Sequence, residues 1–144
     1  MRELTTEITI AAPPERVWAV LTEFETYPDW NPFITRVEGE AVIGSRLDAD
    51  LKPEGRKATR IRPTVVEVEE GRLLAWLGHL GVKGIFDGRH RFEVTPGPDG
   101  GTRFVQSERF SGILSRPIMA MIEKATEAGF RMMNEALRDR SEAR

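Results

Sequence analysis

The chain has 144 residues, of which 40% are hydrophobic and 31% are charged, and this composition is typical of one globular domain. Its 21 basic residues are scattered among 23 acidic ones, so no basic patch indicates nucleic-acid binding. There is no cysteine, which excludes disulfides and thiolate metal sites. No apolar run reaches the roughly 20 residues of a membrane helix, and no signal peptide is visible, so we expect a cytoplasmic protein without integral membrane association.

The first predicted elements are one strand and two short helices. Residues 5–10 alternate polar and apolar side chains, which is typical of a half-buried strand. Pro13 and Pro14 end this strand and suit the first turn of a helix, where a missing N–H is not needed. Apolar residues then recur at helical spacing from 17 to 24. One more helical turn is predicted over residues 25–30, before Pro32.

The middle of the chain predicts successive antiparallel strands. The six candidates are residues 34–40, 46–51, 57–68, 72–80, 86–94 and 102–111, separated by turns rich in glycine and proline. No helix alternates with them, so a parallel sheet is not expected. Pro63 lies inside one candidate and the apolar side chains change phase across it, which predicts a bulge or an edge position.

One long amphipathic helix is predicted over about residues 116–140. Its apolar stripe consists of Ile118, Ile122, Ala125, Gly129, Met133 and Leu137, with Met119, Thr126 and Phe130 beside it. Gly129 costs about 1 kcal/mol relative to alanine in mid-helix, which indicates either a close approach to the sheet or room for a ligand. A sheet that covers one helix wraps around it. The predicted fold is therefore α+β, with a seven-stranded antiparallel curved sheet around the C-terminal helix, in a single domain over residues 1–144.

Several short motifs resemble a known family. They are APPERVW (residues 12–18), YPDWNPF (27–33), DGRHRF (87–92), GTRF (101–104) and ERFSG (108–112). Together they are similar to the START/Bet v 1-like superfamily (SRPBCC), and most of all to its polyketide cyclase/dehydrase-like bacterial branch. The resemblance covers nearly the whole chain and implies a helix-grip fold, with a deep and mostly apolar cavity between sheet and helix. Members include lipid carriers, hormone receptors and cyclases, so the resemblance does not specify one function.

The last predicted hairpin places polar side chains on an apolar face. A turn centred near residue 99 would pair His90 with Glu108, Phe92 with Gln106 and Val94 with Phe104. Strand alternation puts these six side chains on one face, and three of them are apolar, so that face should point inward. A buried carboxylate is costly unless it is paired. A His90–Glu108 pair could orient or deprotonate a ligand, or it could be a structural pair or lie at the solvent-exposed rim.

Further residues are candidates for the wall of the cavity, with core packing as the alternative role. The full set of predicted ligand-binding residues is Trp30, Trp76, His90, Phe92, Phe104, Gln106, Glu108, Phe110, Ile122, Thr126 and Met133. Two apolar loops, residues 81–86 and 112–114, would suit a mouth that opens for a ligand, a cover over the core or a dimer contact. The two histidines lack carboxylates at ligand spacing, so no metal site and no cofactor are expected.

These observations leave three functional hypotheses. The first is a non-enzymatic binder of a hydrophobic small molecule such as a lipid, a polyketide or an aromatic metabolite. The second is a cyclase or dehydratase that uses the same cavity, with His90 and Glu108 as the proton-transfer pair. The third is an adaptor that docks a partner protein through the apolar loops. In each case we expect a monomer or homodimer that binds no nucleic acid.

Overall fold

The computed structural model describes residues 2–143. In chain order its elements are β1 (Arg2–Ile10), α1 (Pro14–Thr22), the 3₁₀ turn η1 (Phe24–Thr26), α2 (Tyr27–Trp30), β2 (Ile34–Glu38), β3 (Asp48–Leu51), β4 (Thr59–Ile61), β5 (Thr64–Glu69), β6 (Leu73–His79), β7 (Asp87–Pro96), the 3₁₀ turn η2 (Pro98–Gly100), β8 (Thr102–Ser111) and α3 (Ser115–Glu142). None of the helices in this range is both long enough and apolar enough to cross a membrane.

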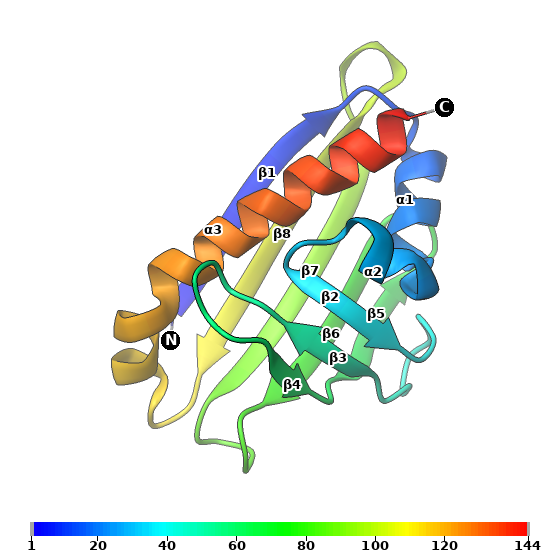
Figure 1. Ribbon diagram of the computed structural model, residues 1–144. Coiled ribbons are helices and arrows are strands. Elements are labelled where there is room, and N and C mark those ends of the chain that lie inside the picture. The colour runs from blue at the N-terminus through cyan, green and yellow to red at the C-terminus, as the bar shows by residue number, and fades with distance from the viewer. Residues whose placement is uncertain (1, 144) are drawn as a thin grey trace.

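The strands form two antiparallel sheets that wrap around one long helix. The larger sheet has the order β1-β8-β7-β6-β5 and the smaller one the order β2-β3-β4. Helix α3 runs diagonally across the larger sheet, and α1 and α2 lie near its C-terminal end (Figure 1). This arrangement confirms the predicted α+β layout. The predicted count of seven strands is wrong, because the described residues form eight strands in two sheets.

Pro63 accounts for the additional strand. The candidate strand 57–68 is divided there into β4 and β5, because proline has no N–H to donate to a sheet ladder. The carbonyl of Pro63 accepts a hydrogen bond from the N–H of Leu47 at 2.8 Å, and an isolated bridge joins Arg46 to Thr64. The two sheets are therefore linked at this point. A register shift in β5 between Val65 and Glu67 adds the bulge that the change of phase predicted.

The hairpin of β7 and β8 has the predicted register. His90 lies opposite Glu108, Phe92 opposite Gln106, and Val94 opposite Phe104. On its other side β8 pairs with β1 over the whole length of that strand, from Arg2 to Ile10. This pairing explains why β1 begins earlier than residue 5, where its alternation of polar and apolar side chains starts.

Gly129 in α3 makes room for a side chain from outside the sheet. A Cβ at this position would overlap Cδ1 of Phe33 and would lie 2.8 Å from Cε1 of the same ring. Phe33 follows α2 in the chain and packs edge-on against Phe130 of α3, with ring centroids 5.5 Å apart. The space beside the glycine is occupied by the Phe33 ring, and not by the sheet backbone or a ligand. Gly129 therefore serves neither of the two predicted roles.

Candidate ligand-binding cavity

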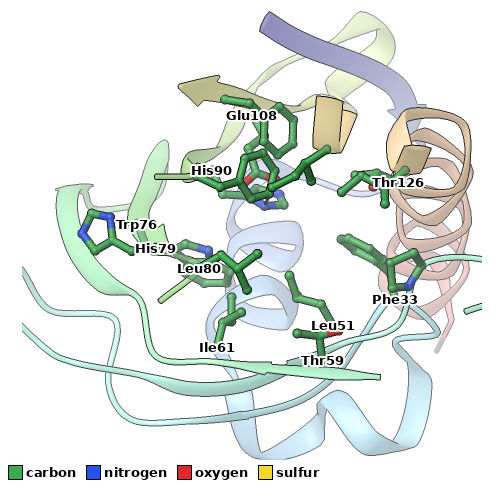
Figure 2. Close-up of a pocket in the computed structure, with 17 residues that line it drawn as sticks. Phe33, Leu51, Thr59, Ile61, Trp76, His79, Leu80, His90, Glu108 and Thr126 are labelled. Atoms are coloured by element: carbon green, nitrogen blue, oxygen red, sulfur yellow. Dashed lines mark ion pairs between the residues drawn. The ribbon is translucent and has the colours of Figure 1, made fainter. Parts of the chain in front are cut away.

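A cavity of about 280 Å³ lies between the two sheets and the N-terminal half of α3. Figure 2 shows side chains from all three layers converging on it, with Leu51 and Ile61 on the side opposite His90 and Glu108, and Thr126 projecting from the helix. Its lining residues are Phe33, Leu51, Pro53, Thr59, Ile61, Trp76, Gly78, His79, Leu80, Phe86, Gly88, His90, Glu108, Phe110, Ile118, Ile122 and Thr126. Most of these side chains are aromatic or aliphatic, as expected for a site that binds apolar ligands.

The cavity occupies one half of the space between helix and sheet. Towards the C-terminal half of α3, the side chains of Phe130 and Met133 are fully buried, as are those of Phe92 and Phe104 on the sheet. The rings of Phe92 and Phe104 are stacked with centroids 6.3 Å apart, so this half is solid core. Towards its N-terminal half the helix presents smaller side chains, such as Thr126, and the cavity remains between them and the sheet.

Six of the eleven predicted ligand-binding residues line the cavity. They are Trp76, His90, Glu108, Phe110, Ile122 and Thr126. Five do not, and they are Trp30, Phe92, Phe104, Gln106 and Met133. Of these five, Phe92, Phe104 and Met133 belong to the solid core. The Trp30 ring packs instead against Tyr27 at 5.0 Å, and its indole N–H donates to Thr26 Oγ1 at 3.2 Å.

Several of the missed lining residues come from the smaller sheet and its loops. The β3–β4 loop reaches α3, where Glu54 N–H donates to the carbonyl of Ala125 at 3.3 Å and the Arg56 guanidinium donates to the carbonyl of Met121 at 2.8 Å. Leu51, Pro53, Thr59 and Ile61 thereby close one side of the cavity. The alternation of Thr59 and Ile61 could have shown that they share a face, but not which element that face covers. Gly78 and Leu80 share the phase of Trp76 along the chain, and this signal could have indicated them.

The predicted pair of His90 and Glu108 is present at the cavity wall. Nδ1 of His90 lies 3.3 Å from Oε1 of Glu108, and the two side chains are 1% and 13% exposed. Gly88 makes this position possible, because a Cβ there would overlap Oε2 of Glu108 and lie 3.2 Å from its Cδ. The carboxylate therefore lies against the backbone of β7, beside the imidazole and open to the cavity.

A chain of buried polar groups supports His90 from behind. Its Nε2 lies 2.8 Å from Oε1 of Gln106, whose Nε2 donates to Asn134 Oδ1 at 2.8 Å and to the carbonyl of Phe130 at 3.4 Å. Asn134 Nδ2 in turn donates to Thr6 Oγ1 at 2.8 Å. The Thr6 hydroxyl donates to the backbone carbonyl of Gln106 at 3.3 Å. Gln106 thus belongs to the support of the site and not to its wall.

The direction of this chain determines the tautomer of His90. The backbone carbonyls of Phe130 and Gln106 can only accept hydrogen bonds, so the amide nitrogen of Gln106 faces Phe130 and its oxygen faces the imidazole. Nε2 of His90 therefore carries a hydrogen and donates to Gln106. Nδ1 is the nitrogen that faces Glu108, and their contact is attractive only when one proton lies between them. The site can thus give or take a proton at the cavity wall.

The two apolar loops lie against each other. The N–H of Ile113 donates to the carbonyl of Gly84 at 3.0 Å, and that of Leu114 donates to the carbonyl of Ile85 at 2.9 Å. Val82 and Ile113 remain 73% and 77% exposed. Leu80 and Phe86, at the two ends of the first loop, line the cavity. Opening of these loops for a ligand, and their use as a protein contact, stay predictions.

Asp87 holds the first of these loops in place. It accepts a hydrogen bond from the N–H of Gly84 at 3.1 Å, and its Oδ1 lies 2.8 Å from Nδ1 of His79. Burial alone would raise the pKa of Asp87, but the hydrogen bonds from His79 and Gly84 outweigh it and hold the pKa below its ordinary value. No three His, Asp or Glu side chains within residues 2–143 are gathered closely enough to hold a metal ion.

An antiparallel sheet wrapped around a long C-terminal helix, with a cavity between them, defines the helix-grip class of proteins. The chain belongs to the family described as polyketide cyclase / dehydrase and lipid transport, whose sequence model matches residues 1–142. This match confirms the resemblance to the corresponding branch of the START/Bet v 1-like superfamily, whose fold accommodates hydrophobic ligands. No curated protein sequence matches the chain.

Solved structures with the same fold include an aromatase/cyclase, a START superfamily protein and Ara h 8.0201. The ZhuI aromatase/cyclase of Streptomyces sp. R1128 is 19% identical, with a TM-score of 0.78 and coverage of 98% of this chain and 93% of that one. A START superfamily protein of Mycobacterium smegmatis is 20% identical, with a TM-score of 0.74 and coverage of 97% of both chains. Ara h 8.0201 is 15% identical, with a TM-score of 0.72 and again 97% coverage of both. At these identities the similarity shows the fold alone.

Proposed function

We propose that the protein binds a compact hydrophobic small molecule, such as a lipid, a polyketide or an aromatic metabolite, in the cavity between the sheets and α3. The observation that carries this proposal is an apolar cavity of about 280 Å³ with one polar pair, His90 and Glu108, in its wall. The family description, which names polyketide chemistry and lipid transport, supports the same class of ligand. The volume is at the lower end of the roughly 300–1,000 Å³ found for small-ligand sites, which favours a compact molecule over a diacyl lipid.

Burial of apolar ligand surface would drive binding. Each 100 Å² removed from water contributes about 2.5 kcal/mol before the costs of association. Trp76, Phe110 and Ile122 supply this surface from three different elements. His90 and Glu108 would then orient the polar end of the ligand, because an apolar wall alone does not distinguish one orientation from another.

Native mass spectrometry of the purified protein, followed by denaturing extraction, tests the proposal directly. A stoichiometric hydrophobic compound released from the protein would support it and would name the class of ligand. The protein should also bind N-phenyl-1-naphthylamine, an uncharged fluorescent probe, and Ile122→Trp should abolish this binding by filling the cavity. Met121→Trp is the matched control, because its side chain is on the adjacent position of α3 but 70% exposed. Equal probe binding by both variants would contradict a ligand in this cavity.

A second candidate function is that of a cyclase or dehydratase in the same cavity. The observation that favours it is the exposure of the His90–Glu108 pair to the cavity, with a tautomer that directs Nδ1 towards the carboxylate. Such a pair could take a proton from a carbon next to a carbonyl group, whose oxygen would receive the electron pair. His90→Ala and Glu108→Gln should then abolish turnover of a poly-β-keto substrate while binding is retained. Unchanged turnover in both variants would exclude the pair as catalytic residues.

A further inference from the structure

We propose that the cavity selects its ligand by charge. It takes compact apolar molecules whose buried polar group is a hydrogen-bond donor without negative charge, such as a phenol, an alcohol or an amine, and it rejects carboxylates. This inference rests on the proposed function, since it requires that the cavity holds a ligand. It is carried by the charges, the hydrogen bonds and the free acceptor at the cavity wall.

The cavity offers no counter-ion to an anionic ligand. Among the lining residues that the structure describes, Glu108 is the one acidic residue, and there is no lysine or arginine. The two histidines of the lining already face carboxylates, His79 that of Asp87 and His90 that of Glu108, so a carboxylate buried here would find no free cationic partner. Burial of an unpaired charge is strongly unfavourable.

The nearby arginines are directed elsewhere. The Arg56 guanidinium, on the loop that closes one side of the cavity, donates to the carbonyl of Met121 at 2.8 Å. The arginines of β7 and β8 alternate with the inward residues, so they occupy the outer face of the sheet. There they pair with acidic residues of neighbouring strands: Arg89 with Glu67, Arg103 with Glu7, and Arg109 with Glu3. A change of rotamer would not bring these guanidinium groups through the sheet, so the cavity cannot acquire a cation from them.

His90 has no hydrogen left to donate to a ligand. Its Nε2–H is given to Gln106 at 2.8 Å, and its Nδ1 faces Glu108 at 3.3 Å. The second carboxylate oxygen, Oε2, receives no hydrogen bond from any residue in the range 2–143, and it lies beside Gly88, which also lines the cavity. The unused position of this pair is therefore an acceptor. A ligand satisfies it by donating a hydrogen bond, which an alcohol or an ammonium group does and an ionised carboxylate does not.

The preference can be measured with three ligands that share one apolar body. These are 2-(2-naphthyl)ethanol, 2-(2-naphthyl)ethylamine and 2-naphthylacetic acid, which at pH 7 are neutral, cationic and anionic. Their dissociation constants are obtained by displacement of N-phenyl-1-naphthylamine. We expect the alcohol and the amine to bind at least about tenfold more tightly than the acid, a modest value because the cavity is open to solvent.

Two variants test whether Glu108 is the cause. Glu108→Gln replaces the carboxylate acceptor, at nearly constant volume, by an amide that can also donate a hydrogen bond, so the acid should gain and the amine should lose about tenfold in affinity. Gly88→Ala keeps the carboxylate but displaces it, and it should weaken the alcohol and the amine but not the acid. Glu127→Gln makes the same change of charge on the exposed face of α3, where Glu127 pairs with Arg131, and should leave all three affinities unchanged.

The outcomes separate this inference from the proposed function. Equal binding of acid and alcohol by the natural protein would overturn the charge selection and leave the ligand-binding function intact. Binding of the probe without binding of the alcohol or the amine would also overturn it, because the free acceptor would then have no role. Failure to bind the probe and all three ligands would instead contradict the proposed function. If Glu108→Gln does not fold, the affinities of the three ligands for the natural protein and for Gly88→Ala are sufficient to test the charge selection.

Discussion

Substitution of Gly129 by alanine tests how tightly α3 packs on the cavity wall. A methyl group at this position would overlap Cδ1 of Phe33 and would lie 2.8 Å from Cε1 and 3.1 Å from Cγ. The Phe33 ring is fully buried and packs edge-on against Phe130 at 5.5 Å, so it has no free space into which to rotate within the core. It can yield only towards the cavity, which it lines.

Two opposing effects determine the magnitude. Alanine in a helix interior is more stable than glycine by about 1 kcal/mol. Overpacking of a well-packed core costs about 1–3 kcal/mol. The net change expected for Gly129→Ala is therefore a destabilisation of up to about 2 kcal/mol, where an ordinary helical glycine would give a stabilisation of about 1 kcal/mol. Since 1 kcal/mol corresponds to roughly 2–4 °C for a chain near this length, the difference in Tm is measurable.

Urea unfolding followed by circular dichroism gives the free energy of unfolding, provided that the slope with denaturant is unchanged. Probe binding should weaken in the same variant, because the displaced Phe33 ring occupies part of the cavity. The double variant Gly129→Ala with Phe33→Leu should be less destabilised than the sum of the two single variants, since the smaller side chain removes the overlap. A more stable Gly129→Ala with unchanged probe affinity would refute the close packing of Gly129 against the Phe33 ring.

Two further predictions concern groups around the cavity. The folded-state pKa of Asp87 is depressed, so its stabilising hydrogen bonds are complete above the ordinary pKa of about 4 and are lost as the pH falls further. The exchange protection of the Gly84 amide should accordingly decrease below about pH 4, and Asp87→Asn should lower it at pH 7; protection that is constant with pH would contradict the role of Asp87. Asn134→Leu should cost about 1–3 kcal/mol in urea unfolding, because it removes the 2.8 Å acceptor of the buried Gln106 amide, and a cost below about 0.5 kcal/mol would argue against the polar chain.

The register of the last hairpin could be predicted because it depends on local information. Side chains alternate along a strand with a period of two, and one turn determines which residues face each other. The turn near Asp99 was recognisable from its glycines and proline, and so the pairing of His90 with Glu108 followed. At Pro63 local information was not sufficient. It indicated an irregularity, but not that the strands before and after the proline belong to two different sheets.

The extent of the cavity could not be predicted from the same patterns. Phe104 and Phe110 have the same alternation in β8, and Ile122 and Met133 lie on one stripe of α3, yet one of each pair is core and the other lines the cavity. The difference depends on where along the helix the large side chains of Phe130 and Met133 lie relative to the sheet. Periodicity specifies the face that a residue occupies but not the distance between two facing layers.

The boundary between the solid and the hollow half of the fold lies at His90, and this position has a consequence for function. Its ring is held on the solid side by Gln106, by the Phe130 ring at 5.0 Å and by Phe92 at 4.4 Å. Its Nδ1 and the Glu108 carboxylate are on the side of the cavity. Because the packed half already fixes the rotamer and the tautomer, a ligand that enters the hollow half meets a polar group that needs no further ordering. The rigid core thus supports the site. Substitutions of Gln106, Asn134 or Thr6 should change the orientation of a bound ligand, although none of these side chains lines the cavity.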